Sequence, residues 1–155
     1  MATHVWSLPG LAGALLLALG ATGESTNGRL TATEFDGPVA AEVQRVVDGD
    51  TIDVRARIWL GQSLNIRVRI DGIDAPELKA RCAEERKRAL AARDYLVRRL
   101  GNGEVRLTSV VYDKYGGRVR AAVSDDAGDV GAALLAKGLA RPYHGERRQP
   151  WCAAT

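Results

Sequence analysis

The chain contains few of the residues on which several kinds of functional site depend. Its 155 residues include two cysteines, two histidines, one phenylalanine and one methionine, and aromatic residues make up 5%. Two cysteines without a nearby pair of histidines argue against a structural zinc site. His144 has no cysteine or serine partner that would form a nucleophilic set, and we assign no role to it. With so few aromatic residues, the core must consist mainly of valine, leucine, isoleucine and alanine.

Long apolar runs are also scarce, and the clearest one lies near the N-terminus. Residues 11–19 are apolar but too few for a membrane span of ~20 residues, whereas they fit the apolar part of a signal peptide. No lysine or arginine precedes Arg29, so the usual basic start is missing, and a misassigned start codon is one alternative. We expect a signal peptide or an uncleaved anchor at 1–23, a linker at 24–40, and one folded domain at 41–155. Export to the periplasm or the medium follows, with membrane association only if the N-terminal segment is retained.

The overall composition is that of a single globular domain with a basic balance. Hydrophobic residues make up 46%, the formal net charge is +3, and the pI is about 9.1. This balance is compatible with a polyanionic partner such as nucleic acid, although +3 is a weak signal by itself. Arginine outnumbers lysine, which slightly favours phosphate contacts because guanidinium groups match phosphate oxygens, the alternative being the codon bias of a GC-rich genome. Nothing in the composition implies a stable protein partner, and we expect a monomer.

Hydrophobic periodicity predicts short strands interrupted by helices. Apolar residues alternate with polar ones in residues 51–60 and again in 64–71, which is typical of half-buried strands. In the second of these, Arg69 falls on the face opposite the apolar set. Residues 84–100 have a helical stripe of alanine and leucine that ends before Gly101. The predicted strands are 41–47, 51–60, 64–71, 105–112 and 118–124, the predicted helices are 84–100 and 130–137, and 139–143 is a final extended piece. This order indicates an α+β fold, mainly β, as either a small closed barrel of the OB type or an open sheet.

Three polar segments carry the candidate chemistry. Residues 47–51 read Val-Asp-Gly-Asp-Thr, residues 67–77 read Arg-Val-Arg-Ile-Asp-Gly-Ile-Asp-Ala-Pro-Glu, and residues 113–118 read Asp-Lys-Tyr-Gly-Gly-Arg. Each acidic segment alone is an ordinary turn or loop sequence. Together they offer carboxylates for a hard cation such as Ca²⁺ and arginines for a phosphate, as metal-assisted phosphodiester hydrolysis requires.

In their order and wording, these segments resemble the staphylococcal nuclease (thermonuclease) family, from about Val43 to about Tyr143. The resemblance implies a five-stranded OB barrel with two or three packed helices and a calcium-dependent nuclease that leaves 3′-phosphate ends. It implies that Asp50, Asp74 and the carbonyl of Ala75 bind calcium. It places Asp48 as an outer acid and Thr51 as a threonine near the metal, and it implies that Glu77 is the general base.

The same resemblance makes Arg69 and Arg118 the candidates for binding the phosphate. Arg69 matches the family pattern directly. Arg118 follows Gly116-Gly117, one glycine more than the common Tyr-Gly-Arg wording, so the turn before it is longer. Arg120 lies on the same strand face and is the substitute if Arg118 does not reach the phosphate.

Two pairs of residues remain open at this stage. Tyr115 and Tyr143 either stack on bases of the substrate or lie half-buried with their hydroxyls hydrogen-bonded. In an exported chain, Cys82 and Cys152 would form a disulfide that ties the C-terminal tail to the segment after Glu77, the alternative being two separate thiols. Loop entropy would give such a bridge roughly 4 kcal/mol.

The sequence therefore favours a secreted calcium-dependent nuclease that acts on DNA and, as a second substrate, RNA. The main alternative is a catalytically impaired OB module that binds nucleic acid or a protein. The acidic residues argue for the enzyme, because Asp50, Asp74 and Glu77 are all present. The extra glycine before Arg118 is the one argument for the alternative. An exported interaction domain that uses none of these motifs is the third hypothesis.

Overall fold

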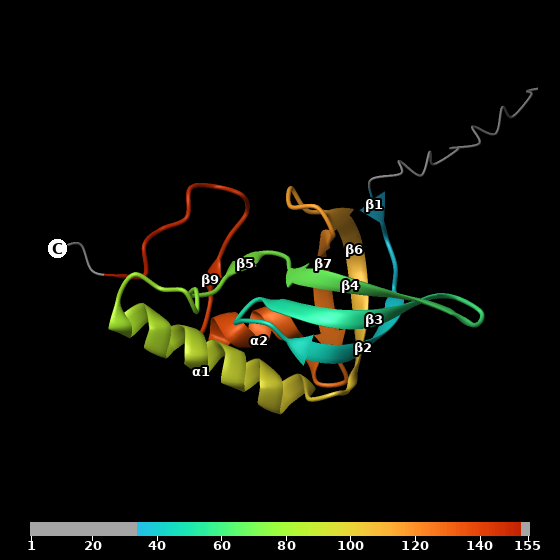
Figure 1. The fold of residues 1–155 in the computed structure, drawn as a ribbon, viewed down its shortest axis with the longest axis horizontal. Helices are drawn as coiled ribbons and strands as arrows, with labels where there is room; N and C mark the ends of the chain where they lie inside the picture. The colour runs from blue at the N-terminus through green and yellow to red at the C-terminus, as the bar shows by residue number, and fades with distance from the viewer. Residues whose placement is uncertain (1–33, 153–155) are drawn as a thin grey trace, which may run out of the picture.

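The computed structural model describes residues 34–152, which form a β barrel flanked by two helices (Figure 1). The long strands and the helices match the predicted order. The elements are β1 (Glu34–Phe35), β2 (Val39–Val46), β3 (Thr51–Trp59), β4 (Gln62–Ile70), β5 (Ile73–Asp74), α1 (Ala83–Leu100), β6 (Glu104–Tyr112), β7 (Arg118–Asp125), β8 (Gly128–Asp129), α2 (Val130–Ala136) and β9 (Arg141–Pro142).

Five strands close the barrel. β2, β3 and β4 pair in antiparallel order, β4 pairs with β7 in parallel, β7 pairs with β6, and β6 returns to β2. The β4–β7 contact is parallel, which the long connection through β5, α1 and β6 makes possible. This closed arrangement confirms the OB barrel and excludes the open sheet.

The interior of the barrel is filled by the apolar set that the alternation predicted, but only for part of β3. Ile52, Val54 and Ala56 are at most 4% exposed. Ile58 and Leu60 were predicted on the same buried face, yet they are 54% and 88% exposed. The β3–β4 hairpin extends past the barrel, so its tip has nothing to pack against (Figure 1). Strand alternation says which face a residue shares, but it does not say where the opposing layer ends.

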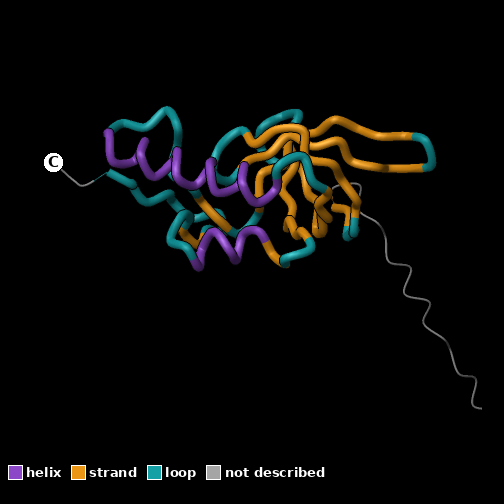
Figure 2. The backbone as a smooth tube through the Cα atoms, turned by 90° about the horizontal axis from the view of Figure 1, so that it is seen from below, coloured by secondary structure: helices purple, strands orange, loops and turns teal. Residues whose placement is uncertain are grey.

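The two helices lie on the same side of the barrel, as Figure 2 shows. α1 buries the predicted stripe of Ala89, Ala92, Leu96 and Leu100. Its N-terminal cap is Cys82, whose sulfur accepts the amide of Glu85, and two glutamates in its first turn complement the helix dipole. α2 buries Val130 and Leu134 and is capped by Asp129. None of the helices in the described part of the chain is both long and apolar enough to span a bilayer.

Three short strands were not predicted, namely β1, β5 and β8. β5 pairs with β9, which lies within the extended piece predicted at 139–143, and the pairing joins Ile73 to Pro142 and Asp74 to Arg141. β8 pairs with β7. β1 pairs with β6, and it lies inside the segment that we predicted as linker, as do the first two residues of β2. Two-residue strands are too short to show a periodic pattern, so only the three-dimensional pairing identifies them. Residues 1–23, the predicted signal peptide, lie outside the described residues.

Candidate active site

The acidic segments meet at one rim of the barrel. The turn between β2 and β3 is bound to the end of β4, because the amide of Ile70 donates to the carbonyl of Asp50 at 2.8 Å. Gly49 allows this turn to pack closely, since a Cβ there would lie 2.8 Å from the side chains of both Ala75 and Ala92. A larger residue at position 49 would push the turn away from Ala75, which follows β5, and from α1. The first two motifs, which are far apart in sequence, are therefore adjacent.

Three charged side chains are buried together at this rim. Asp50, Arg69 and Asp74 are 4%, 6% and 6% exposed. Arg69 lies between the acids: its Nη1 donates to Asp50 Oδ2 at 2.5 Å, and its Nη2 lies 3.4 Å from Asp74 Oδ1. Nη2 also donates to the carbonyl of Ile73. The alternation placed Arg69 off the apolar face, and the acidic loops explain why it is nevertheless buried.

The neighbours of Asp50 fix its orientation. The Thr51 hydroxyl donates to Asp50 Oδ1 at 2.8 Å, and the amide of Ala75 donates to Oδ2 at 3.2 Å. Asp48 accepts the amide of Asp50 at 3.1 Å. Burial, followed by the negative charge of Asp50, raises the pKa of Asp48 to about 6. Acids are therefore crowded at this turn, and a cation there would relieve their repulsion.

The donor set at the rim fits a hard divalent cation. Asp50 and Asp74 already converge on one positive group, the guanidinium of Arg69. Among residues 34–152, the one cluster of three potential ligand atoms within 4.8 Å of one another is Cys82, Glu85 and Cys152, whose sulfurs form a disulfide. A cation at the rim would thus be held by two carboxylates, and backbone oxygens and water would complete its shell. Ca²⁺ accepts irregular oxygen shells of this kind, with distances of ~2.3–2.6 Å.

Glu77 lies beside this centre and is held by an arginine that the sequence analysis did not identify. Its side chain is 50% exposed, and its Oε1 accepts Arg148 Nη1 at 2.6 Å. Arg148 also contacts Asp74, with Nε 2.9 Å from Oδ1. The predicted base is thus linked to a predicted metal ligand through one guanidinium. Arg148 belongs to a segment without periodicity, so no local pattern marked it.

The C-terminal tail reaches the rim because it is covalently attached there. Cys82 and Cys152 form a disulfide, one of the two alternatives that the sequence left open. Next to it, Trp151 donates its indole N–H to Asp74 Oδ2 at 3.3 Å. Glu85, which is 8% exposed, accepts the amide of Glu77 at 3.4 Å and so connects the Glu77 loop to α1. Neither Trp151 nor Glu85 was identified from the sequence as part of this site. The proposed disulfide was the one sequence signal that placed the tail here.

Arg118 belongs to a second group of side chains. Its Nε donates to Asp113 Oδ2 at 2.6 Å, and its guanidinium lies 4.8 Å from the centre of the Tyr115 ring. Burial is the largest single influence on Asp113 and would raise its pKa. The hydrogen bond and the charge of Arg118, together with the amide of Lys114 and the charge of Arg69, outweigh it, so the pKa of Asp113 is lowered. The extra glycine is accommodated at Gly117, whose φ of 75° suits glycine. Arg120, the substitute, is paired instead with Asp71 on the surface.

Tyr143 lies near the first group. Its ring centre is 5.9 Å from the guanidinium carbon of Arg69 and 5.9 Å from that of Arg148. Its amide donates to the carbonyl of Gly72, which fixes the chain after β9. Tyr115, by contrast, is 57% exposed. The two tyrosines therefore flank separate arginines.

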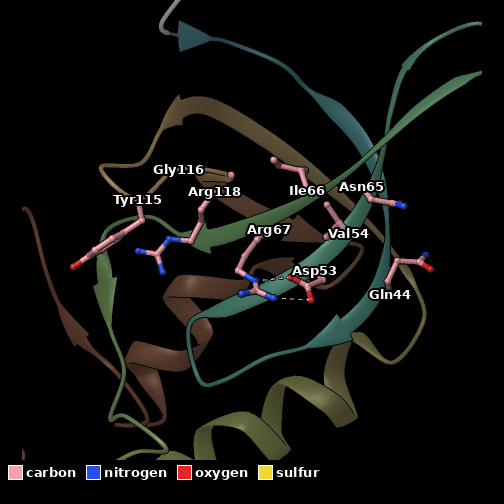
Figure 3. A pocket seen from close by; sticks show the side chains of 10 residues that line it. Gln44, Asp53, Val54, Asn65, Ile66, Arg67, Tyr115, Gly116 and Arg118 are labelled. Atoms are coloured by element: carbon pink, nitrogen blue, oxygen red, sulfur yellow. Dashed lines mark hydrogen bonds and ion pairs between the residues drawn. The ribbon is translucent and has the colours of Figure 1, made fainter.

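A groove of about 550 Å³ runs over the barrel surface from the Arg118 group (Figure 3). Asp53 lies within it and is bound by Arg67, with Nε 2.7 Å from Oδ1, and by Arg45. Two exposed amides, Gln44 and Asn65, line the groove away from Arg118. The complete lining is Gln44, Asp53, Val54, Asn65, Ile66, Arg67, Tyr115, Gly116, Gly117 and Arg118.

A closed OB barrel that holds acids and arginines at one rim defines a class of protein suited to binding a phosphate chain. The comparison with family models gives the specific assignment: the model described as "Staphylococcal nuclease homologue" matches residues 67–152. That match covers more than half of the chain, and the protein belongs to this family. The matched segment contains Arg69, Asp74, Glu77 and Arg118, while Asp50 precedes it. No curated protein matches the chain.

Proposed function

We propose that the protein is a secreted, calcium-dependent nuclease that hydrolyses phosphodiester bonds of DNA, with RNA as a second substrate. The observation that carries this proposal is the burial of Asp50, Arg69 and Asp74 at one rim, with Glu77 linked to Asp74. Buried charges are costly, and a chain keeps them together where chemistry uses them. Membership in the nuclease-homologue family supports the same conclusion.

Each side chain has a role that follows from its chemistry. Asp50 and Asp74 would hold the cation, and Ala75 would add its carbonyl. A divalent cation bound there supplies a Lewis acid and lowers the pKa of a bound water. Glu77, half-exposed beside this centre, accepts a proton from the attacking water.

The arginines would neutralise the charge that develops on the phosphate. Arg69 touches both acids of the rim, so a phosphate bound beside them lies next to its guanidinium. Arg118 would approach the phosphate from the neighbouring group. Fixed donors of this kind each contribute several kcal/mol to lowering a barrier, ~3–4 kcal/mol in measured cases. Low sequence selectivity follows, because the groups address the phosphate chain.

The groove next to Arg118 gives the substrate strand a path away from the rim. It begins at an exposed aromatic ring, Tyr115, on which a base can stack, and it continues past the amides of Gln44 and Asn65 (Figure 3). Its lining includes two arginines, Arg67 and Arg118, and one acid, Asp53, so its charge is positive. A single strand of nucleic acid matches both features.

The test is hydrolysis of a fluorogenic DNA oligonucleotide by the purified chain, with calcium and then with EGTA. We expect activity with calcium, little with EGTA, and a fall of about 100-fold or more in kcat for Glu77→Gln, the usual scale for losing a general base. Glu84→Gln is the matched control, because Glu84 is an exposed glutamate of α1 paired with Arg88. Far-UV circular dichroism should be unchanged in both variants.

Several outcomes would refute the proposal. Full activity of Glu77→Gln would remove the assigned base, and equal activity in EGTA would remove the metal. DNA binding without cleavage by the wild-type chain would instead favour the non-catalytic OB module.

Export is part of the same proposal. The Cys82–Cys152 disulfide supports it, because such bonds persist in oxidising compartments. The apolar run at 11–19 lies outside the described residues and supports it from the sequence alone. Cell fractionation tests it: recovery of the chain only from the cytosol would count against export.

A further inference from the structure

Arg148 joins the two carboxylates to which the proposed reaction gives different tasks. Its guanidinium contacts Asp74 at 2.9 Å through Nε and Glu77 at 2.6 Å through Nη1. The two contacts use different nitrogens, so one rigid planar group sets the position of one carboxylate relative to the other. Neither family resemblance nor local sequence pattern assigns a role to this residue.

The backbone is held on both sides of Arg148. On the N-terminal side, β9 pairs with β5 and the amide of Tyr143 donates to the carbonyl of Gly72. On the C-terminal side, Cys152 is bonded to Cys82, and Trp151 donates to Asp74. Arg141 of β9 stacks on Trp151 at 3.7 Å and donates to the carbonyl of Pro150 at 3.2 Å. We call residues 143–152, from Tyr143 to the disulfide, the C-terminal strap. Because it is anchored in this way, the C-terminal strap fixes the position of Arg148 at the rim.

Glu77 needs such a partner because its own surroundings leave it loose. Its side chain is 50% exposed, and Arg148 supplies the one side-chain contact recorded for its carboxylate in the described part of the chain. The backbone of Glu77 is anchored by Glu85, but that bond does not fix the side-chain rotamer. A half-exposed glutamate without a partner samples several rotamers, and ordering it costs side-chain conformational entropy.

We propose that Arg148 is a positioning residue that holds the Glu77 carboxylate beside Asp74, and that the C-terminal strap exists in part to place it there. This inference rests on the proposed function, because it assigns Arg148 to the same site. Arg148 acts through Glu77, so its loss should affect turnover and leave substrate affinity nearly unchanged.

The positive charge of Arg148 should also affect calcium binding, which a purely structural role would not predict. Arg148 is a positive charge next to Asp74, a proposed calcium ligand. Removing it takes away a like charge from the neighbourhood of the cation. Calcium affinity should therefore stay equal or rise, even though turnover falls.

The experiment compares Arg148→Ala, Arg148→Lys and Arg147→Ala in the full chain. Arg147 is the matched control, being an exposed arginine of the same strap, one residue away. Steady-state hydrolysis of a DNA oligonucleotide gives kcat and KM, and calorimetric titration with calcium gives the metal affinity without relying on activity. We expect Arg148→Ala to lower kcat about 10- to 100-fold, the scale for a misplaced group, with KM changed less than about threefold.

The remaining variants and readouts define the result further. Arg148→Lys keeps the positive charge but loses the planar guanidinium group that contacts two carboxylates at once. Its kcat should therefore lie between those of the wild type and Arg148→Ala. Arg147→Ala should stay within about twofold of the wild type in every readout. The calcium Kd of Arg148→Ala should be equal to that of the wild type or up to about tenfold lower.

Three results would overturn the inference while the proposed function stands. A wild-type kcat in Arg148→Ala would show that Glu77 needs no such support. A raised KM with kcat unchanged would make Arg148 a substrate contact. Loss of calcium binding together with activity, in a chain with unchanged circular dichroism, would show that Arg148 maintains the acidic rim instead of positioning Glu77. Absence of cleavage by the wild-type chain would instead refute the proposed function, and this inference with it.

Discussion

Two arginine–aspartate clusters at different places in the molecule are arranged in opposite ways. In the cluster at the C-terminal end of α1, Arg99 forms a bidentate pair with one acid. Its Nε lies 2.6 Å from Asp125 Oδ2, and its Nη2 lies 2.8 Å from Oδ1. At the rim, Arg69 is shared between Asp50 and Asp74, and a third acid, Asp48, is close by. The first cluster is balanced in charge and the second has an excess of negative charge.

The pKa shifts show the same contrast. The hydrogen bond from Arg99 holds the pKa of Asp125 below its usual range. Burial and the charge of Asp50 raise the pKa of Asp48 to about 6. An acid with a lowered pKa stabilises the fold in its ionised form, whereas one with a raised pKa destabilises it when ionised. The Arg99 cluster therefore stabilises the barrel against α1, whereas the ionised acids at the rim cost stability in the absence of the proposed cation.

The largest expected effect separates the two arginines by activity. Arg69→Ala should lower kcat about 1,000-fold, at the upper end for loss of one preorganised donor. Arg99→Ala should leave kcat within about twofold, because Arg99 lies about 20 Å along α1 from the helix end that supports Glu77. Hydrolysis rates measured at 20 °C on chains shown by circular dichroism to be folded make the comparison. Equal losses in both variants would mean that the two clusters do not differ in role.

The fold was largely predictable because it rests on repeated local patterns. The alternation in 51–60 and 64–71 and the stripe in α1 each extend over many residues, and the structure confirms the elements that they predicted. The elements that the patterns did not predict correctly are either very short strands or residues that extend beyond the packed barrel. β1, β5 and β8, which were not predicted, have two residues each, and Ile58 and Leu60 follow the pattern past the edge of the barrel. No period in the sequence records where a neighbouring layer stops.

The site was predictable only where the residues form a recognisable motif. Asp50, Arg69 and Asp74 lie in two such segments, and the structure brings these segments together. Arg148 and Glu85 were missed because their contacts join segments that are distant in sequence and carry no motif. The roles assigned to all of these residues remain predictions.

A somewhat smaller effect should distinguish the two arginines of β7. Arg118→Ala should lower kcat about 100-fold, since its guanidinium is the candidate for the second phosphate contact. Arg120→Ala should change kcat less than about threefold, because Arg120 forms an exposed surface pair with Asp71. Single-turnover hydrolysis of the same oligonucleotide measures both. The reverse order would make Arg120 the phosphate-binding residue and would show that the extra glycine moved Arg118 out of reach.

The smallest expected effect concerns the stability that the Arg99 cluster provides. Asp125→Asn removes a carboxylate whose side chain is 13% exposed and which binds Arg99 with both oxygens. We expect the free energy of unfolding at pH 7 to fall by about 2 kcal/mol, somewhat less than for a fully buried pair.

The direction in which this stability difference changes with pH follows from the lowered pKa of Asp125. The advantage of the wild type over Asp125→Asn should be complete above the unfolded-state pKa of ~3.9 and should vanish as the pH falls through the lower folded-state pKa. Urea unfolding between pH 2 and pH 8, in EGTA, measures it, and Asp126→Asn is the control because the Asp126 side chain is 99% exposed. An advantage that persisted unchanged at the lowest pH would show that the carboxylate charge of Asp125 is not what stabilises this end of the barrel.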